Sequence, residues 1–139
     1  MLSQVSIFTE NKKGAMLAIT NILKEQGINI LGSITNDSPE YGIIRRVVSH
    51  PQNAVEALSG AGYMCKMTDE LGVELQDKVG ELNRLLNALD ESNINVNYLY
   101  LSFNRDSGSP VMVFHTNDIM EVEDCLETKG FQVLQFLRE

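Results

Sequence analysis

The sequence predicts an α+β protein built from two tandem ferredoxin-like βαββαβ units, each with an antiparallel sheet, packed side by side. Three observations lead to this class. The chain has 139 residues, of which 43% are hydrophobic and 22% are charged, a balance typical of a folded protein with its own core. The second half of the chain repeats the first. Each half also passes through strand-like and helix-like apolar spacing in the same order.

The repeat appears when the sequence is shifted by 66 positions. Seven of the twenty-five positions from residue 11 to residue 35 are then identical, and a block nearer the end of each copy matches at a shift of 68. We therefore assign residues 1–68 to the first unit and residues 69–139 to the second. The identical pairs are Lys12/Lys78, Gly14/Gly80, Asn21/Asn87, Leu23/Leu89, Glu25/Glu91, Ile28/Ile94 and Asn29/Asn95.

A strand and then an amphipathic helix open each unit. Residues 3–9 alternate apolar and polar side chains, which predicts a strand. Residues 15–26 repeat apolar side chains at helical spacing, and Gly27 suits the left-handed conformation that ends many helices. The second copy ends its helix at Asn93, the other residue type that tolerates this conformation. Its apolar stripe consists of Leu82, Leu85, Leu86 and Leu89.

An antiparallel hairpin, a short helix and a closing strand complete each unit. The hairpin strands flank stretches rich in turn-forming residues. The predicted hairpins join residues 28–35 to 41–49 across 36–40, and residues 95–103 to 110–116 across 106–109. Residues 63–67 and 131–137 are the closing strands. Only Thr68, Asp69 and Glu70 lie between the copies, so we expect the units to pack rigidly against each other.

One strand of the second unit carries apolar side chains on both faces. Tyr98 and Tyr100 are in phase with Ile94 and Val96, which predicts that the tyrosines face the helices. The opposite face then carries Leu99, Leu101 and Phe103. An apolar patch of this kind marks an interface, which could join two copies of the chain, dock an enzyme, or pack the two sheets of one chain together.

The charge of the chain argues against nucleic-acid binding. Eleven basic and nineteen acidic residues give a net charge of −8. Residues 1–68 carry a net +1 and residues 69–139 a net −9, so a small anion should prefer the first unit. Phosphate contacts require clustered cations, which this chain lacks. It also lacks an apolar run long enough to span a membrane and the basic start of a signal peptide, so we expect a cytoplasmic protein.

The sequence offers no reactive constellation. Cys65 and Cys125 lie far apart in dissimilar contexts, which predicts two buried free thiols. His50 and His115 stand alone, so structural or surface roles are favoured over metal binding. We find no paired nucleophile and base, no glycine-rich phosphate loop and no acid dyad, and therefore expect neither catalysis nor a cofactor. The first strand-to-helix loop also lacks the CxxC of copper chaperones and the phosphate-binding arginine of acylphosphatases.

The loop before the first helix is the best candidate for binding an anion. Gly14 lets backbone N–H groups approach a ligand closely, and the helix that starts there presents unpaired donors and the positive end of its dipole. Asn11 offers an amide, and Lys12 and Lys13 favour anions. A simpler alternative is that Asn11 only caps the helix and the lysines are solvated. In the second copy Asp77 and Glu81 already place carboxylates at the helix start, so the first loop is the better carboxylate site.

Two short motifs resemble the signature of the ACT family, small regulatory units that bind amino acids and control metabolic enzymes. In that family a loop of the form Asn-Arg-Pro-Gly opens the first helix, and a run similar to Gly-Ile-Asn-Ile opens the second strand. This chain has Asn11-Lys-Lys-Gly14 and Gly27-Ile-Asn-Ile30. Lys13 and Val79 replace the usual proline in the two copies, which loosens the loop but keeps its glycine. The likeness covers nearly the whole chain and implies a free-standing tandem ACT protein.

The ligand is expected in a seam between the units. A helix of about 13 residues is roughly 20 Å long, so Asn11 and Asn29 lie at opposite ends of one unit and cannot share a small ligand. If the units pair about a pseudo-twofold axis, the loop of one meets the second strand of the other, where ACT pairs hold their ligands. The first predicted site comprises Asn11, Lys12, Lys13, Gly14, Ala15 and Met16 with Asn95, Val96 and Asn97. A second, weaker site comprises Asp77, Gly80, Glu81 and Leu82 with Asn29, Ile30 and Leu31.

The resemblance implies a regulatory protein rather than an enzyme. It would bind a free amino acid at the seam, form a homodimer or contact a metabolic enzyme, and need no cofactor, metal, nucleic acid or membrane. The alternative from the residues themselves is an interaction subunit that docks on an enzyme through its apolar sheet face, whether or not a ligand is bound.

Overall fold

The computed structural model describes residues 1–36 and 42–139. The chain divides into two compact units, which we call the first unit (Ser3–Thr68) and the second unit (Asp69–Arg138). Met1–Leu2 belongs with the second unit and Glu139 with the first. Both units are ferredoxin-like, with helices on an antiparallel sheet, so the predicted α+β class is confirmed.

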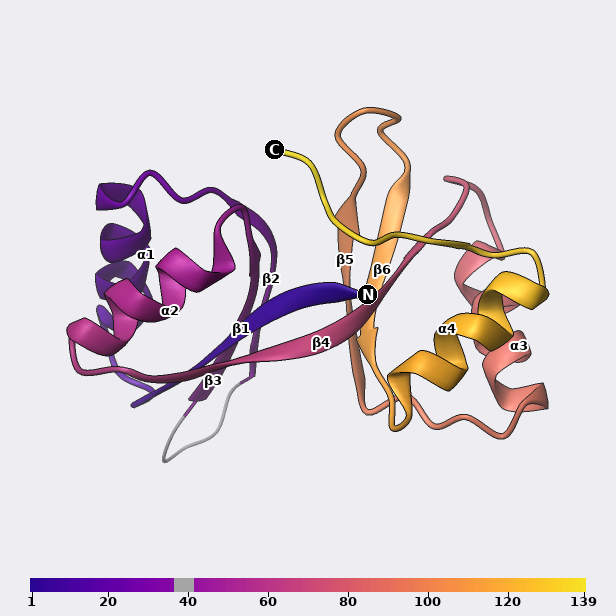
Figure 1. The fold of residues 1–139 in the computed structure, drawn as a ribbon, viewed down its shortest axis with the longest axis horizontal. Coiled ribbons are helices and arrows are strands. Elements are labelled where there is room, and N and C mark those ends of the chain that lie inside the picture. The colour runs from indigo at the N-terminus through magenta and orange to yellow at the C-terminus, as the bar shows by residue number, and fades with distance from the viewer. Residues whose placement is uncertain (37–41) are drawn as a thin grey trace. The chain divides into compact units, whose positions relative to one another are not determined.

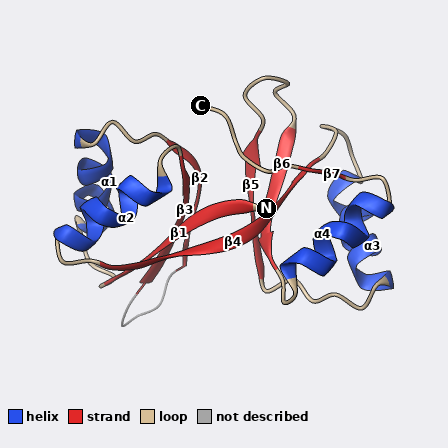
Figure 2. Ribbon diagram, in the orientation of Figure 1, coloured by secondary structure: helices blue, strands red, loops and turns tan. Residues whose placement is uncertain are grey.

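The first unit places two helices on one face of its sheet (Figures 1 and 2). Its strands pair antiparallel in the order β2-β3-β1, and a hydrogen bond from Gln4 to the Thr68 hydroxyl (3.3 Å) links β1 to the first part of β4. The predicted turn at residues 36–40 lies almost wholly outside the described residues. The elements are β1 (Leu2–Thr9), α1 (Ala15–Glu25), β2 (Ile30–Asn36), β3 (Gly42–Val48), α2 (Pro51–Gly60) and β4 (Met64–Glu74).

The second unit repeats this plan. Its sheet has β4 between β7 and β6, with β5 at the edge, and all of these pairs are antiparallel. Two helices cover one face of this sheet (Figure 1). The remaining elements are α3 (Glu81–Glu91), β5 (Tyr98–Phe103), β6 (Pro110–His115), α4 (Ile119–Thr128) and β7 (Gln132–Val133).

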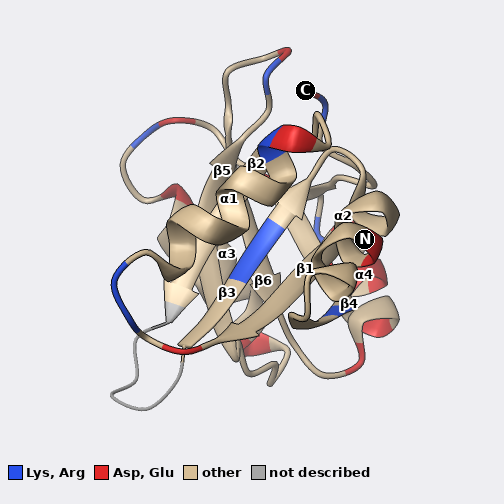
Figure 3. Cartoon of the chain, turned by 90° about the vertical axis from the view of Figure 1, so that its left-hand side faces the viewer, with Lys and Arg blue, Asp and Glu red and all other residues tan. Residues whose placement is uncertain are grey.

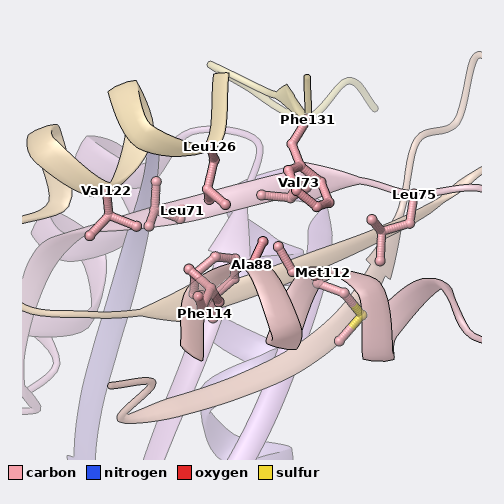
Figure 4. Close-up of a cluster of buried hydrophobic side chains, with 11 residues drawn as sticks. Leu71, Val73, Leu75, Ala88, Met112, Phe114, Val122, Leu126 and Phe131 are labelled. Carbon is pink, nitrogen blue, oxygen red and sulfur yellow. The ribbon is translucent and has the colours of Figure 1, made fainter. Parts of the chain in front are cut away.

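Each unit has its own apolar core between sheet and helices. In the second unit, side chains of β4 and β6 meet those of both helices, as the labelled residues of Figure 4 show. The predicted stripe of α3 divides accordingly, because Leu85 and Leu89 are buried whereas Leu82 and Leu86 remain partly exposed. The core of the first unit consists of Val5, Ile7, Ile19, Leu23, Ile28, Ile44, Val48, Ala54 and Leu58.

The predicted helix ends are confirmed, and two strand predictions are wrong in extent. Gly27 (φ 67°) and Asn93 (φ 57°) both adopt the left-handed conformation just past their helices. The closing strand of the second unit is only β7, although the Leu134 N–H still bonds the Gly72 carbonyl at 2.8 Å. The closing strand of the first unit, predicted over residues 63–67, is part of the longer β4 (Met64–Glu74), which runs without interruption through residues 68–70.

The predicted faces of β5 are also reversed. Leu99 packs against the core beneath α3 and α4, and Leu101 and Phe103 follow it on that face, while Tyr98 and Tyr100 lie on the other. The strand begins only at Tyr98, and the residues from Asn93 to Asn97 are not regularly extended. An alternation counted from Ile94 therefore slips by one position, which exchanges the two faces. Leu101 and Phe103 remain exposed, by 64% and 49%.

Candidate functional site

A cavity of about 580 Å³ opens in the first unit beside the loop that joins β1 to α1. We call it the first cavity, and the loop of residues 10–14 the first loop. All six residues predicted from this side of the site line it, together with positions at the ends of β1, β2 and β3. Its lining is Thr9, Glu10, Asn11, Lys12, Lys13, Gly14, Ala15, Met16, Leu17, Thr35, Gly42 and Ile44.

The residue before α1 supplies no side-chain cap. The Lys12 N–H bonds the Glu10 carbonyl (3.0 Å), and the Lys12 carbonyl accepts from the Ala15 N–H (3.2 Å), so the loop turns tightly into α1. Gly14 is the residue before the helix, at φ 85°, and it has no side chain with which to cap the N–H groups that follow. The first turn of α1 also lacks an acidic residue. The start of this helix therefore has no carboxylate of its own.

In the second unit the equivalent loop already holds a carboxylate. Residues 76–80, the second loop, end at Gly80 with nearly the same backbone angles as Gly14. Glu81 follows, and its Oε2 accepts from the Gln76 N–H (3.4 Å) and from Arg84 Nη2 (3.0 Å). The hydrogen bond from Arg84 is the main reason that the pKa of Glu81 lies below its ordinary value.

The shift of 66 gives the matching positions in the first unit. Ala15 stands where Glu81 stands and Ala18 where Arg84 stands, so α1 supplies neither the carboxylate nor its guanidinium partner. Glu81 is only 7% exposed and Ala15 only 9%, so the two positions are similarly enclosed. The same loop geometry therefore occurs twice. In the second unit the carboxylate of Glu81 lies in the loop, whereas in the first unit the first turn of the helix supplies no acidic side chain.

The inner walls of the first cavity are apolar. Met16 lines it from α1, and its thioether sulfur accepts a hydrogen bond from the Thr35 hydroxyl at the end of β2 (3.5 Å). Ile44 is buried and lines the cavity from β3. The charged residues belong to the first loop, where Lys12 Nζ and Glu10 Oε2 form an exposed ion pair at 3.3 Å. Figure 3 is viewed from the side of the first unit, and it marks basic positions in blue and acidic positions in red along the loop that leads into α1.

The family model for the ACT domain pair matches residues 1–138. The chain belongs to the ACT domain pair family. The resemblance carried by its glycine loops is thus confirmed. No curated protein matches the ACT pair in sequence.

Solved structures resemble the ACT pair over most of its length. Protein BT0572 from Bacteroides thetaiotaomicron is 26% identical, with 96% of this chain and 91% of that chain covered and a TM-score of 0.88. The ligand-free regulatory subunit of aspartate kinase from Thermus thermophilus is 15% identical over 92% of both chains, with a TM-score of 0.68. The corresponding subunit from Thermus flavus is 18% identical over 90% of this chain and 88% of that chain, with a TM-score of 0.65.

The other half of the first predicted site lies before β5. Asn95 lines a more polar cavity of about 430 Å³ in the second unit, and its amide donates to the Asn97 side chain (3.2 Å). Val96 is half-buried against the core. A side-chain hydrogen bond thus joins Asn95 to Asn97. Contact between these residues and the first loop remains a prediction.

The second predicted site divides in the same way. Asp77, Gly80, Glu81 and Leu82 belong to the second loop and the start of α3. Asn29 and Ile30 line a shallow cavity of about 390 Å³ at the start of β2, and Leu31 is buried. The Ser49 hydroxyl accepts from the Asn29 N–H at 2.9 Å, which fixes this corner.

Sequence reasoning missed the far wall of the first cavity. Thr35, Gly42 and Ile44 come from the hairpin of β2 and β3, where Thr35 pairs with Ile44. The predicted hairpin could have indicated that these strand ends lie together, but not that they lie beside the first loop. Leu17 and Glu10 adjoin the predicted segment and could have been included from their positions alone.

A partly buried polar cluster around Glu70 in the second unit was also missed. The Tyr98 hydroxyl donates to Glu70 Oε1 at 2.6 Å, and His115 Nδ1 lies 3.3 Å from Glu70 Oε2. The rings of Tyr98 and His115 are stacked, with centroids 5.6 Å apart. His115 thus lies beside a carboxylate that its sequence neighbours did not indicate.

The two cysteines each lie beside a serine hydroxyl. Cys65 and Cys125 are free thiols, but each is partly rather than fully buried, beside the hydroxyl of Ser59 or Ser92. Within residues 1–36 and 42–139, histidine, cysteine and carboxylate side chains form no group of three that could hold a metal ion. In the same part of the chain no helix is both long and apolar enough to cross a bilayer.

Proposed function

We propose that this ACT pair is a non-enzymatic regulatory protein that binds a free amino acid at the first cavity. The observation that carries the proposal is the contrast between the two loops. The second loop holds the carboxylate of Glu81, and the first loop has the same backbone with Ala15 in its place. Family membership supports a regulatory role, and an unfilled carboxylate site beside a cavity supports a small carboxylic acid as its ligand.

The ligand would bind with its carboxylate at the start of α1 and its ammonium group near the oxygens of the first loop. Asn11 and Glu10 are the polar side chains in reach of that group. We further propose that Asn95, Val96 and Asn97 close the site from the second unit. Binding would then bridge the units and favour one arrangement of them, which a metabolic enzyme or a second copy of the chain could detect.

The decisive experiment is a calorimetric titration with each of the twenty amino acids. We expect at least one to bind the wild type and to lose most of its affinity for Asn11→Ala and Gly14→Val. Gly130→Val is the matched control, because Gly130 has the same left-handed conformation (φ 89°) outside both predicted sites and so carries the same backbone strain. Flat traces for all twenty amino acids would remove the proposal.

A second candidate function is a ligand-independent interaction subunit. Exposed apolar side chains in the second unit favour it, namely Leu101 (64% exposed), Phe103 (49%) and Phe136 (63%). Affinity capture of partner enzymes by the wild type and by Asn11→Ala separates the two candidates. The interaction subunit captures the same enzyme equally well in both cases, with or without amino acids.

A further inference from the structure

We infer that the amino acid held in the first cavity has an uncharged, extended apolar side chain of the leucine or methionine type. The inference rests on the proposed function and adds the class of ligand, with Met16 as the residue that determines specificity.

The orientation of the ligand follows from the second loop. There the carboxylate of Glu81 lies at the start of the helix, within 3.4 Å of the Gln76 N–H. The equivalent point in the first loop is at Glu10 and Ala15, on the loop side of the cavity. A ligand with its carboxylate there has its side chain directed toward the remaining walls, which α1, β2 and β3 form.

Those remaining walls carry no charged side chain among the described residues. Their members are Met16 and Leu17 from α1, Thr35 from β2, and Gly42 and Ile44 from β3. The Thr35 hydroxyl already donates to the Met16 sulfur, so the polar group of this wall has a partner within the protein. An ammonium, guanidinium or carboxylate placed against these walls would lose water without gaining a partner, whereas methylene groups would gain contact.

The lysines of the first loop do not favour a ligand with an acidic side chain. Lys12 and Lys13 line the cavity only from the first loop and are exposed, and Lys12 is paired with Glu10. They lie on the side assigned to the ligand carboxylate. An acidic ligand side chain that reached back to them would leave the apolar walls uncovered.

Met16 provides the test because it is half-exposed, at 51%, and lies outside the apolar core of the first unit. Met120 is the second residue of α4, as Met16 is of α1; it is 71% exposed and lies outside both predicted sites, so Met120→Glu is a matched control. Calorimetric titrations with L-leucine, L-methionine, L-glutamate and L-lysine are carried out on the wild type, Met16→Glu and Met120→Glu. Thermal melts without ligand check that each variant is folded, and Leu17→Glu replaces Met16→Glu if the latter does not fold.

The expected result is that leucine or methionine binds the wild type at least about tenfold more tightly than glutamate and lysine. Met16→Glu should weaken that binding about tenfold or more, and Met120→Glu should leave it unchanged. Glutamate or lysine binding as tightly as leucine and methionine would overturn the inference but leave the proposed function intact. Unchanged leucine or methionine affinity in folded Met16→Glu would likewise overturn it. Absence of binding by all twenty amino acids overturns the proposed function and the inference with it.

Discussion

Replacing Ala15 by glutamate should strongly weaken ligand binding without damaging the fold. The substitution gives the first loop the carboxylate that Glu81 supplies in the second. Both positions are almost equally buried, at 9% and 7% exposure, and both follow a glycine with φ near 90° (85° at Gly14 and 91° at Gly80). A glutamate at position 15 can therefore adopt the conformation that Glu81 already has.

The size of the stability change follows from the helix terminus. An acidic residue in the first turn stabilises a helix by about 0.3–1 kcal/mol. The further contribution of an arginine partner is missing, because Ala18 occupies the position equivalent to Arg84. Ala15→Glu should thus raise the free energy of unfolding slightly. The tethered carboxylate competes with the ligand at a high local concentration and should weaken amino-acid binding by about tenfold or more.

Urea denaturation measures the first effect and calorimetry the second. Ala15→Gln is the control for size, since it fills the same space with a neutral side chain and should keep more of the binding. A folded Ala15→Glu variant that binds amino acids as the wild type does would refute the assignment of the carboxylate site. A variant that loses binding only because it is destabilised by more than about 1 kcal/mol would contradict the assumed equivalence of the two loops.

Three further predictions concern the second unit. Gly80→Ala should lower the free energy of unfolding by about 1–2 kcal/mol, because it forces a side chain into the left-handed region of backbone conformation. The added Cβ meets no atom within 4 Å, so backbone strain is the whole cause. Urea denaturation measures the loss, and an unchanged midpoint would contradict it. Because the folded pKa of Glu81 lies below its ordinary value of 4.5, the stability it contributes is present above about pH 4.5 and disappears as pH falls through the folded pKa. Glu81→Gln should therefore be less stable than the wild type at pH 7, and the difference should shrink in denaturation curves recorded toward pH 3; a difference independent of pH argues against the Arg84 pair. Tyr98→Phe removes the hydroxyl that donates to the buried Glu70 carboxylate at 2.6 Å. It should lower the free energy of unfolding by about 1–3 kcal/mol, as measured by thermal or urea denaturation. An unchanged stability would show that Glu70 does not depend on this bond.

Local sequence signals predicted the helices and the first loop well. Gly27 and Asn93 follow α1 and α3 in the left-handed conformation expected of those residue types, and Gly14 and Gly80 precede the same two helices in that conformation. These features depend on one or two residues and their immediate neighbours. The same is true of the six predicted residues that line the first cavity, which are consecutive in the chain.

Features that depend on the start of a strand or on distant contacts were not predictable. The phase of β5 depends on where the extended backbone begins, and the irregular residues after Asn93 conceal that point. The far wall of the cavity at Thr35 and Ile44 depends on how the hairpin packs against the start of α1. Glu70 and Tyr98 are 28 positions apart, and no local pattern signals that their side chains meet.

Binding at the first cavity can be located residue by residue by an NMR titration of the ¹⁵N-labelled chain with the amino acid that binds most tightly in the calorimetric panel. We expect the largest amide shifts at residues 11–17, with Gly14 and Met16 among them, and only small shifts at residues 77–83, because Glu81 already occupies their loop. Large shifts confined to the second loop, or shifts that leave residues 11–17 unchanged at saturation, would contradict this expectation.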